Sequence, residues 1–350
     1  MKIGRILTVA SIAGAAVAAL VLEARRNQHS QVLAGKTVLV TGGSRGFGLA
    51  IAQEFGRRGA RLVLLSRNQE DLNNARRSLL ARGVAEADIM TLVCDLKDFE
   101  QTQAAVARAT ERFGQIDILI NNAGVITVGP VENQPLSAFH DAMESNYYTM
   151  LHATLAVLPQ MLGRQEGSIA NITSIGGKLA VPHLLPYSAS KFAAVGFSQG
   201  LGAEMRSKGI RVTTVCPGLM RTGSHVHAKF TGNREREYRW FSLSANLPGI
   251  SASATHAANR VVNAVLAGET EIAITPQAAI ASMLAQVAPA YTSAAMQWVN
   301  SKLLPEPISG GADAPEPGSA VRGTRDLRRL IPLGGRERRP FSASSASTAS

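Results

Sequence analysis

The sequence is poor in cysteine, in aromatic residues and in clustered charge. Its 350 residues include only two cysteines, Cys94 and Cys216, and they form no C-x-x-C pair. Two isolated thiols exclude a disulfide framework and favour buried free thiols in a reducing compartment. Aromatic residues make up only 5% of the chain, and no run of five or six like charges occurs between residues 27 and 305. A dedicated nucleic-acid surface is therefore not expected there.

The net charge of +11 is concentrated at the two ends of the chain. Residues 1–26 hold four basic residues and one acidic residue, and residues 306–350 hold seven arginines and five acidic residues. The 279 residues between them carry 25 basic and 19 acidic side chains, a mild excess that is spread evenly. Nucleic-acid binding would then be confined to the Arg-rich tail, where it would depend steeply on salt.

The first 26 residues differ from the rest. Lys2 and Arg5 precede an uncharged run from Ile6 to Leu22, and Arg25 and Arg26 follow it. As a helix, these seventeen residues would span about 25 Å, the short end of the range for crossing a bilayer. The pattern fits a membrane anchor, a cleaved secretory signal or an organelle-targeting peptide. We favour the membrane anchor.

From Lys36 onward, short β-rich runs alternate with longer helical stretches. Continuous Val, Ile and Leu runs separated by helices predict a parallel sheet that is buried on both faces. The fold class is therefore α/β, with one doubly wound domain over residues 35–275. Strands are expected at Thr37–Thr41, Arg61–Leu65, Ile89–Cys94, Ile116–Asn121, Ser168–Thr173, Ile210–Cys216 and Glu271–Ile274, and helices at residues 46–57, 69–82, 99–113, 136–162, 187–207 and 252–267.

Three segments fall outside this alternation. Residues 223–250 are irregular and aromatic, which is typical of a lid or binding loop. Residues 276–304 are apolar and are broken by Pro289, so they predict two short helices. The Pro, Gly, Ser and Arg composition of residues 305–350 predicts a disordered tail.

The first predicted strand leads directly into a glycine-rich loop, and a helix follows. Glycines let the backbone turn sharply and approach a pyrophosphate, while the helix N-terminus supplies amide donors and a positive dipole. A strand before the loop and a helix after it favour a dinucleotide site over an ordinary turn. The loop residues expected to bind the cofactor are Gly42, Ser44, Arg45, Gly46, Phe47 and Gly48.

The end of the second predicted strand bears on the choice of cofactor. A carboxylate there would favour NAD, but Arg67 follows the strand instead. Arg67 and Arg45 together would hold a 2′-phosphate through charge-assisted hydrogen bonds, so NADP is expected and NAD is less favoured. Asp95, at the end of the third strand, would accept a hydrogen bond from the adenine amino group. Its alternative role is that of a helix N-cap or turn residue.

Tyr187 and Lys191 lie four residues apart at the start of a predicted helix, so they share one face. A tyrosine needs help to act near neutrality, because its free pKa is about 10. A nearby cation favours the phenolate and lowers that pKa. Ser174 ends the preceding strand and is expected to face the same cleft from the carboxyl edge of the sheet.

With these residues in place, the chain resembles the short-chain dehydrogenase/reductase family, a Rossmann-type fold, over about residues 35–275. The set is specific in combination and in order, although Phe47 stands where a branched aliphatic residue is usual. The residues that carry the resemblance are the Thr41–Gly48 loop, Asn121-Asn122-Ala123-Gly124, Asn146, Ser174, Tyr187, Lys191 and Pro217-Gly218.

The resemblance implies a role for each of these residues. Tyr187 would exchange a proton with the substrate oxygen, and Ser174 would hydrogen-bond that oxygen. Lys191 would bind the nicotinamide ribose and lower the tyrosine pKa, and Asn146 would hold a water that links Lys191 to solvent. Asn121 would line the cofactor cleft. The further implied cofactor contacts are Asn122, Ala123, Gly124, Tyr187, Lys191, Pro217, Gly218 and Thr222.

The expected function is that of an NADP-dependent oxidoreductase acting on a carbonyl or secondary alcohol, with a lipophilic substrate. The alternative is a non-catalytic dinucleotide-binding redox sensor or scaffold. Because NADP is an intracellular cofactor, the predicted anchor would hold the domain on the cytoplasmic side. We also expect a homodimer or homotetramer. No metal site is expected, since His225 and His227 have no acidic or thiol partner at metal-binding spacing.

Overall fold

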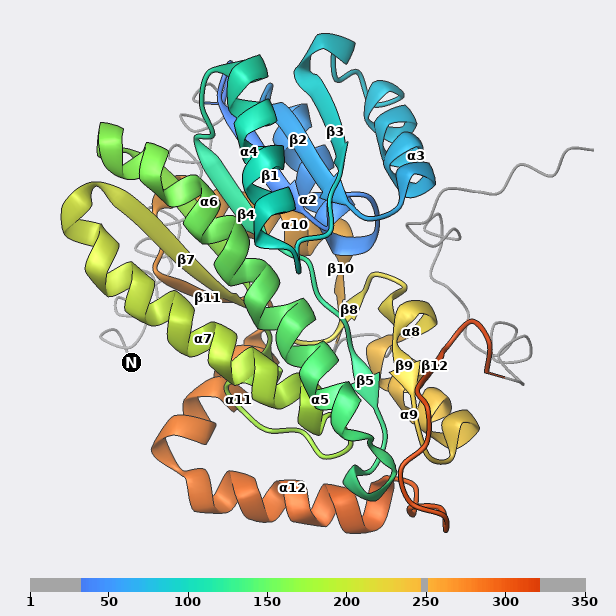
Figure 1. Cartoon of the computed structure of the whole chain (residues 1–350). Helices are drawn as coiled ribbons and strands as arrows, with labels where there is room; N and C mark the ends of the chain where they lie inside the picture. Colours follow the sequence, from blue (N-terminus) through green and yellow to red (C-terminus); the bar gives the residue numbers. More distant parts are fainter. Residues whose placement is uncertain (1–32, 247–250, 322–350) are drawn as a thin grey trace, which may run out of the picture.

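The computed structural model describes residues 33–246 and 251–321. Its centre is a seven-stranded sheet in the order β11-β7-β6-β4-β1-β2-β3, with all neighbouring strands parallel (Figure 1). The order reverses between β1 and β4, and doubly wound folds bind ligands at the carboxyl ends of such neighbours. The predicted fold class is confirmed. The strands are β1 (Thr37–Thr41), β2 (Arg61–Ser66), β3 (Ile89–Val93), β4 (Ile118–Asn121), β6 (Gly167–Ile172), β7 (Ile210–Cys216) and β11 (Glu271–Ala273).

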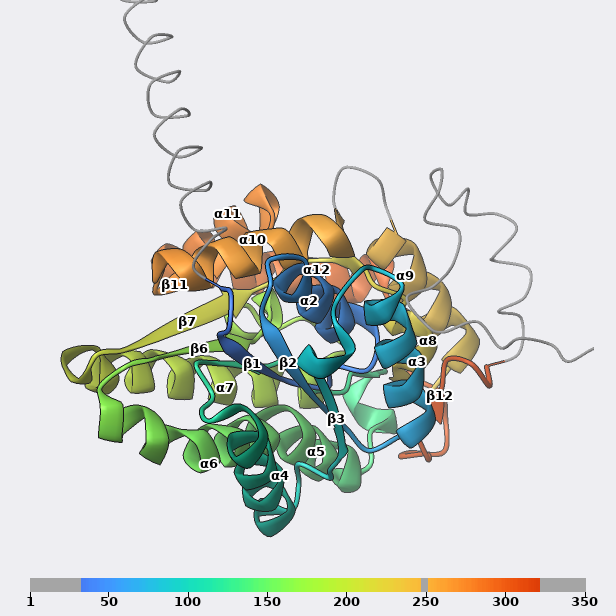
Figure 2. The ribbon, with the colours of Figure 1, turned by 90° about the horizontal axis from the view of Figure 1, so that it is seen from above.

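Helices cover both faces of this sheet (Figure 2). Along β1, Val38 and Val40 pack with α2, α3 and α10, whereas Leu39 packs with α4, α6 and α7. Burial on both faces explains why the strands read as continuous apolar runs. The helices on the two faces are α2 (Gly46–Arg57), α3 (Gln69–Leu80), α4 (Phe99–Phe113), α5 (Leu136–Met143), α6 (Thr149–Arg164), α7 (Leu185–Met205) and α10 (Ala254–Ala267), and single turns lie at Glu86–Asp88, Val131–Asn133, Ile175–Gly177 and Arg206–Lys208.

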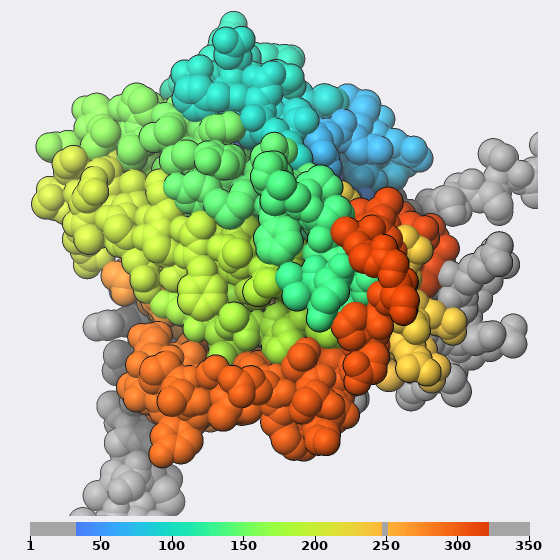
Figure 3. All heavy atoms as spheres, turned by 60° about the horizontal axis from the view of Figure 1, so that its bottom comes forward, coloured from blue at the N-terminus to red at the C-terminus, as the bar shows by residue number. Residues whose placement is uncertain are grey.

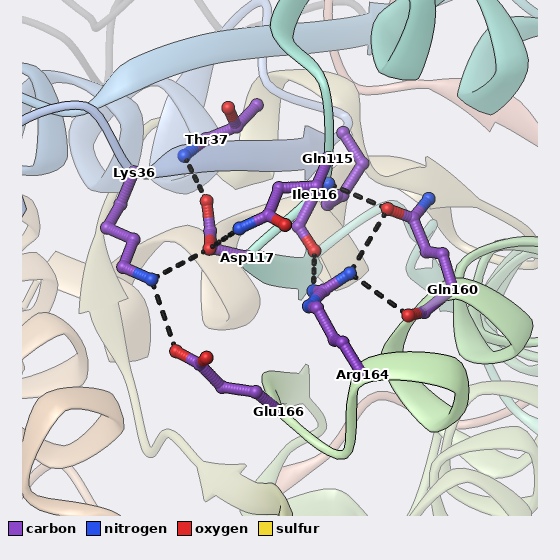
Figure 4. Close-up of polar contacts among 8 residues, drawn as sticks. All are labelled: Lys36, Thr37, Gln115, Ile116, Asp117, Gln160, Arg164 and Glu166. Atoms are coloured by element: carbon purple, nitrogen blue, oxygen red, sulfur yellow. Dashed lines mark hydrogen bonds and ion pairs between the residues drawn. The ribbon is translucent and has the colours of Figure 1, made fainter.

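A polar network fixes the end of the sheet where β1 and β4 begin (Figure 4). The buried carboxylate of Asp117 accepts hydrogen bonds from the Thr37 backbone at 2.8 Å and from Lys36 Nζ at 3.0 Å. The hydrogen bond to Asp117 raises the pKa of Lys36. In the same network, Arg164 donates to the Ile116 carbonyl. The sheet is thus tied together at the amino ends of β1 and β4, opposite the carboxyl ends of these strands.

The segment between β7 and α10 is folded. Within the predicted lid, residues 223–250, the structure contains two helices and a short strand, and residues 247–250 lie outside the described part. Its aromatic side chains form a small core of their own, separate from the two cores of the sheet. The short elements of this region are β5 (Thr127–Val128), β8 (Met220–Arg221), α8 (Ser224–His227), β9 (Lys229–Phe230), α9 (Arg234–Asn246) and β10 (Ala252–Ser253).

The chain after β11 forms α11 (Pro276–Val287) and α12 (Pro289–Leu303), followed by β12 (Glu316–Pro317). The expectation of disorder from residue 305 is wrong for residues 305–321. There β12 pairs with β9 in antiparallel fashion, and Val321 is buried. Composition misled the prediction because these residues pack through backbone hydrogen bonds rather than through an apolar face of their own.

Helices α11 and α12 expose many large apolar side chains, although Lys302 is the only charged residue between positions 276 and 303. No helix in the described ranges combines the length and apolarity needed to cross a bilayer. The predicted anchor at residues 6–22 and the tail at 322–350 lie outside the described residues. The exposed apolar side chains are Ile280, Met283, Leu284, Val287, Tyr291, Trp298 and Leu303.

Candidate active site

The glycine loop turns tightly between β1 and α2. Gly42 has a φ of +61° and Gly46 a φ of +55°, a backbone region that favours glycine. A Cβ on Gly48 would lie 2.3 Å from the Gly42 carbonyl oxygen, so helix and turn approach too closely for any side chain. At Gly46 the nearest atom to such a Cβ is the Thr222 carbonyl oxygen, 3.9 Å away. Gly46, the first residue of α2, therefore faces the segment of Thr222, and a helix N-terminus at this place offers backbone donors that suit an anion.

Thr41 ties this loop to the segment after β4. Its hydroxyl accepts hydrogen bonds from the backbone N–H groups of Asn122 and Ala123, at 2.9 and 3.1 Å. The Asn122 side chain donates to the carbonyls of Thr41 and Gly42, both at 3.2 Å. The structure thus brings the predicted Asn122 and Ala123 beside the glycine loop. The Asn122 side chain holds the backbone of that loop through these two hydrogen bonds.

At the end of β2, the Ser44 hydroxyl donates to the Ser66 hydroxyl at 2.9 Å, which joins loop and strand. Arg67 is exposed, and no hydrogen bond or ion pair involves its side chain within the described residues. Arg45 lies 3.6 Å from the carboxylate of Asp71 on α3. Arg45 and Arg67 therefore both lie near the end of β2, but the charge of Arg45 is already paired with that of Asp71.

Two predicted cofactor residues have evident structural roles. Phe47, in the first turn of α2, is 8% exposed, and its side chain packs in the core, so a contact of this residue with a cofactor would come from its backbone. Its aromatic ring fills core space where a smaller aliphatic residue would serve. Asp95 accepts a hydrogen bond from the Lys97 backbone at 3.1 Å, as a turn residue does, and it remains half-buried after β3.

The three predicted catalytic side chains lie together at the carboxyl end of β6. Lys191 Nζ lies 5.8 Å from the centroid of the Tyr187 ring and donates to the Ile172 carbonyl at 3.0 Å. Ser174 lies two residues after β6, and its hydroxyl lies close enough to Tyr187 to lower the pKa of the phenol. The same hydroxyl accepts from the Gly176 backbone at 3.0 Å, which fixes its position.

Burial governs the protonation of this group. It raises the pKa of Tyr187 by disfavouring the phenolate, and the hydrogen bond from Ser174 opposes that rise. It lowers the pKa of Lys191 to about 8 by disfavouring the ammonium ion. The role of Lys191 in lowering the tyrosine pKa stays a prediction, because burial of the phenol is the largest influence on the pKa of Tyr187 here. Tyr187 is consequently protonated at neutral pH.

Asn146 lies in a π-helical turn, Glu144–Tyr148, between α5 and α6. This turn carries its fully buried side chain to the segment after β4, where it donates to and accepts from the backbone of Val125 at 3.0 and 2.8 Å. It also donates to the Ser190 hydroxyl on α7 at 2.9 Å. A Cβ on Gly124 would lie 2.6 Å from the Asn146 oxygen and 3.6 Å from Lys191 Nζ. Gly124 thus lies between Asn146 and Lys191.

Asn121 does not line the cleft as expected. Its side chain is 2% exposed and donates to Thr154 on α6 and to Asn171 on β6, both at 2.9 Å. Asn171 donates in turn to Ser198 at 2.9 Å, and Ser198 lies 2.7 Å from the Thr214 hydroxyl. This buried polar chain crosses three strands and stabilises the sheet.

The predicted residues after β7 lie across from the glycine loop. The Pro217 carbonyl accepts a backbone hydrogen bond from the turn after Ser174 at 2.8 Å. A Cβ on Gly218 would lie 3.1 Å from the Thr275 hydroxyl at the start of α11, so glycine allows that helix to approach. Thr222 lies opposite Gly46, as noted above.

Sequence reasoning missed several polar side chains that shape the site. His227 lies close enough to Arg45 that this charge, after burial, lowers the histidine pKa. The missed residues act through contacts between distant segments, for which the sequence carries no spacing signal. They are Ser66, Ser190, His183, His227 and Glu237.

The chain is similar to known proteins over most of this fold. The family described as short chain dehydrogenase matches residues 36–230. A Dehydrogenase/reductase SDR family protein 7-like of Drosophila melanogaster is 34% identical over 266 residues, which cover 75% of this chain and 79% of that protein. Oxidoreductase UcpA of Salmonella typhimurium is 40% identical over 191 residues, which cover 54% of this chain and 71% of that protein.

A solved structure supports the same relationship. A single-site variant of actinorhodin polyketide ketoreductase, crystallised with NADPH, superposes with a TM-score of 0.59 at 32% identity. The match covers 70% of this chain and 92% of that one. The parallel sheet, the glycine loop and the Ser, Tyr and Lys side chains therefore agree with the sequence relationship: the chain belongs to the short-chain dehydrogenase family.

Proposed function

We propose that this protein reduces a ketone to a secondary alcohol with NADPH. The observation that carries the proposal is the grouping of Ser174, Tyr187 and Lys191 at the carboxyl end of β6, on the same edge of the sheet as the glycine loop. A protein that only binds a dinucleotide needs no such grouping. The similar ketoreductase crystallised with NADPH supports the reaction class.

The raised pKa of Tyr187 favours the reductive direction, because a protonated phenol is a proton donor. When bound, NADPH supplies a hydride to the carbonyl carbon. The carbonyl π electrons move onto oxygen, which takes the Tyr187 proton and becomes the alcohol. Ser174 orients that oxygen through its hydroxyl. The Lys191 ammonium ion, 5.8 Å from the ring centroid, stabilises the phenolate that remains.

Cofactor binding would use the glycine loop and the segments that follow β4 and β7. Gly42, Gly46 and the start of α2 would hold the pyrophosphate, and Arg67 with Arg45 would hold the 2′-phosphate. Asp95 would bind the adenine. The nicotinamide ribose would lie beside Gly124 and Lys191, and Asn146 would hold the water that links Lys191 to solvent. The nicotinamide itself would lie against Pro217, Gly218 and Thr222.

The substrate would be lipophilic. Tyr187 packs against an apolar cluster that includes Val128, Phe230, Tyr238 and Phe241, and Trp240 packs against the same cluster. Phe230, Tyr238 and Phe241 are buried, whereas Trp240 is only partly buried. We name this cluster, with the partly buried side chains packed on it, the aromatic wall. An apolar group beside the carbonyl would gain affinity from contact with the partly buried side chains of the wall.

We further propose that residues 6–22 hold the domain at the cytoplasmic face of a membrane, and that α11 and α12 pair two copies of the chain. Charge is depleted in the core of protein interfaces, as it is on these helices. Cell fractionation of the full chain tests the first idea, and a fully soluble full-length protein would contradict it. Light scattering of the Val287→Asp variant tests the second.

The function is tested by NADPH oxidation with ketones of increasing size. Replacing Tyr187 by Phe should lower kcat by about 10³-fold, since it removes the proton donor. NADPH binding, measured by calorimetry, should stay close to that of the unaltered protein. The matched control is Tyr148→Phe, which removes an exposed phenol from the end of the π-helical turn. If NADPH binds but no ketone is reduced, the protein is a dinucleotide sensor instead.

A further inference from the structure

Residues 305–321, here named the strap, lie across the aromatic region that faces Tyr187. Figure 3 shows the strap in red, between the green segment that includes β5 and the yellow segment that includes α9. The family match ends at residue 230, so the strap lies outside it. In addition to the pairing of β12 with β9, three sets of contacts attach the strap to the rest of the molecule.

The first attachment is the side chain of Asn133, which is fully buried. Its amide donates to the carbonyls of Ile308 and Gly311 at 3.1 and 2.7 Å, and its oxygen accepts from the Ile308 backbone at 3.1 Å. One side chain thus binds the strap backbone on both its donor and its acceptor side, as a neighbouring β-strand would. The Asn133 carbonyl adds a hydrogen bond from Asp313 at 3.2 Å.

The second attachment joins the strap to the start of α9. One oxygen of Asp313 accepts from the Gly232 backbone at 3.0 Å, and the other lies 2.6 Å from the Arg234 guanidinium. Gly232 has a φ of +67°, so it forms the turn that leads from β9 into α9. Asp313 therefore fixes the position at which α9 begins.

The third attachment is apolar and leads to the reacting group. Val321, at the end of the described strap, is 6% exposed and belongs to the cluster with Phe230 and Tyr238. Tyr187 packs against that same cluster. A Cβ on Gly318 would lie 2.3 Å from the His225 carbonyl oxygen, which shows how closely the strap lies on α8.

We infer that the strap holds the aromatic wall in place for the substrate, with Asn133 and Asp313 as positioning residues. This inference rests on the proposed ketone reduction. The strap contacts β9 and the start of α9, the elements that carry the aromatic cluster, and no hydrogen bond or ion pair of the described residues joins it to the glycine loop. Loosening the strap should therefore weaken the binding of a ketone that reaches the wall and leave cofactor binding unchanged.

The Asp313→Ala variant of the full chain tests this inference, with 2-decanone and 2-butanone as probes. The variant loses the contacts of the Asp313 carboxylate with Gly232 and Arg234, so the aromatic wall should be held less firmly. The KM for 2-decanone should therefore rise by about five- to tenfold. The KM for 2-butanone and the KM for NADPH should change by less than about twofold. Asp313→Asn keeps an acceptor for Gly232, so it should restore part of the loss. Glu306→Ala is the matched control, since it removes an exposed carboxylate from the same strap.

A second readout does not require turnover. Arg236 and Arg239 are exposed on α9, so trypsin cleavage there reports how firmly the helix is held. Cleavage should be several-fold faster in Asp313→Ala than in Glu306→Ala. Equal cleavage rates, or an unchanged KM for 2-decanone in an active enzyme, would overturn the inference. If neither ketone is reduced, the proposed function fails, and the cleavage rates alone decide whether the strap holds α9.

Discussion

Nδ1 of His183 lies 2.8 Å from the carboxylate of Glu237, and both side chains are buried. This contact joins α9 to the loop that leads into α7, the helix of Tyr187. The other carboxylate oxygen accepts from Trp240 Nε1 at 2.6 Å. His183 has a φ of +62°, and its carbonyl accepts from the Gly129 backbone at 2.8 Å. The uncommon backbone conformation of His183 is thus held by its side-chain contact with Glu237 and by its backbone hydrogen bond with Gly129.

Replacing Glu237 by Ala should destabilise the protein. It leaves the N–H groups of His183 and Trp240 without an acceptor in a buried site, which costs about 3 kcal/mol of the free energy of unfolding. Urea denaturation followed by circular dichroism measures this change. Glu235→Ala, on the exposed side of α9, is the matched control and should change stability by less than about 0.5 kcal/mol. Equal stabilities of the two variants would contradict the role assigned to Glu237.

Much of the fold could be predicted because it depends on local patterns. Strands β1 and β7 have the predicted bounds, since continuous apolar runs mark strands that are buried on both faces. Tyr187 and Lys191 could be placed together because helical spacing fixes their relationship. Ser174 could be added because the carboxyl ends of parallel strands meet at one edge.

The failures involve contacts between segments far apart in the chain. Nothing in the residues around Asn121 indicates that its partners lie on α6 and β6. The pKa of Tyr187 depends on how deeply its phenol is buried, which spacing cannot reveal. Residues 305–321 have the composition of a disordered segment, and the contacts that order them are made by distant residues, among them Asn133, over 170 positions earlier.

Lys191→Met should raise stability at neutral pH. The lysine pKa is about 8 in the native state and 10.5 as its ordinary value. Between these values the unfolded chain holds a proton that the native protein lacks, so the lysine contribution to stability rises with pH. Below pH 8 the native state bears the whole cost of the buried ammonium ion, up to about 3 kcal/mol.

The Lys191→Met variant has no such titration. The free energy of unfolding of the variant should exceed that of the unaltered protein most near pH 7, and this difference should shrink as the pH rises toward 10. Thermal melts across this range measure the difference, in which shifts of other groups cancel. Catalysis should be lost in the same variant, because the methionine cannot stabilise a phenolate. A constant difference in stability with pH would mean that Lys191 is not buried as an ammonium ion.

Gly48→Ala should strongly weaken dinucleotide binding. The added Cβ would lie 2.3 Å from the Gly42 carbonyl oxygen and 2.5 Å from the Asn122 amide, so the turn must open. Opening it moves the backbone amides that would face the pyrophosphate. Calorimetric titration should show roughly a hundredfold weaker binding of NADPH, on the order of 3 kcal/mol. Gly163→Ala, where a Cβ meets nothing within 4 Å, should bind normally.

The choice between NADPH and NADH should depend on a competition for Arg45. Arg67 is free of partners among the described residues and would contribute its full charge to a 2′-phosphate, so Arg67→Ala should raise the KM for NADPH about tenfold and leave that for NADH unchanged. Arg45 is drawn toward Asp71, 3.6 Å away, and would have to leave that partner. Asp71→Asn removes the competing charge and should therefore lower the KM for NADPH by about two- to fivefold, a modest gain because the pair is partly exposed to solvent. If Asp71→Asn instead lowered the KM for NADH alone, this corner would not bind a phosphate, and Arg45 would serve only to join the loop to α3.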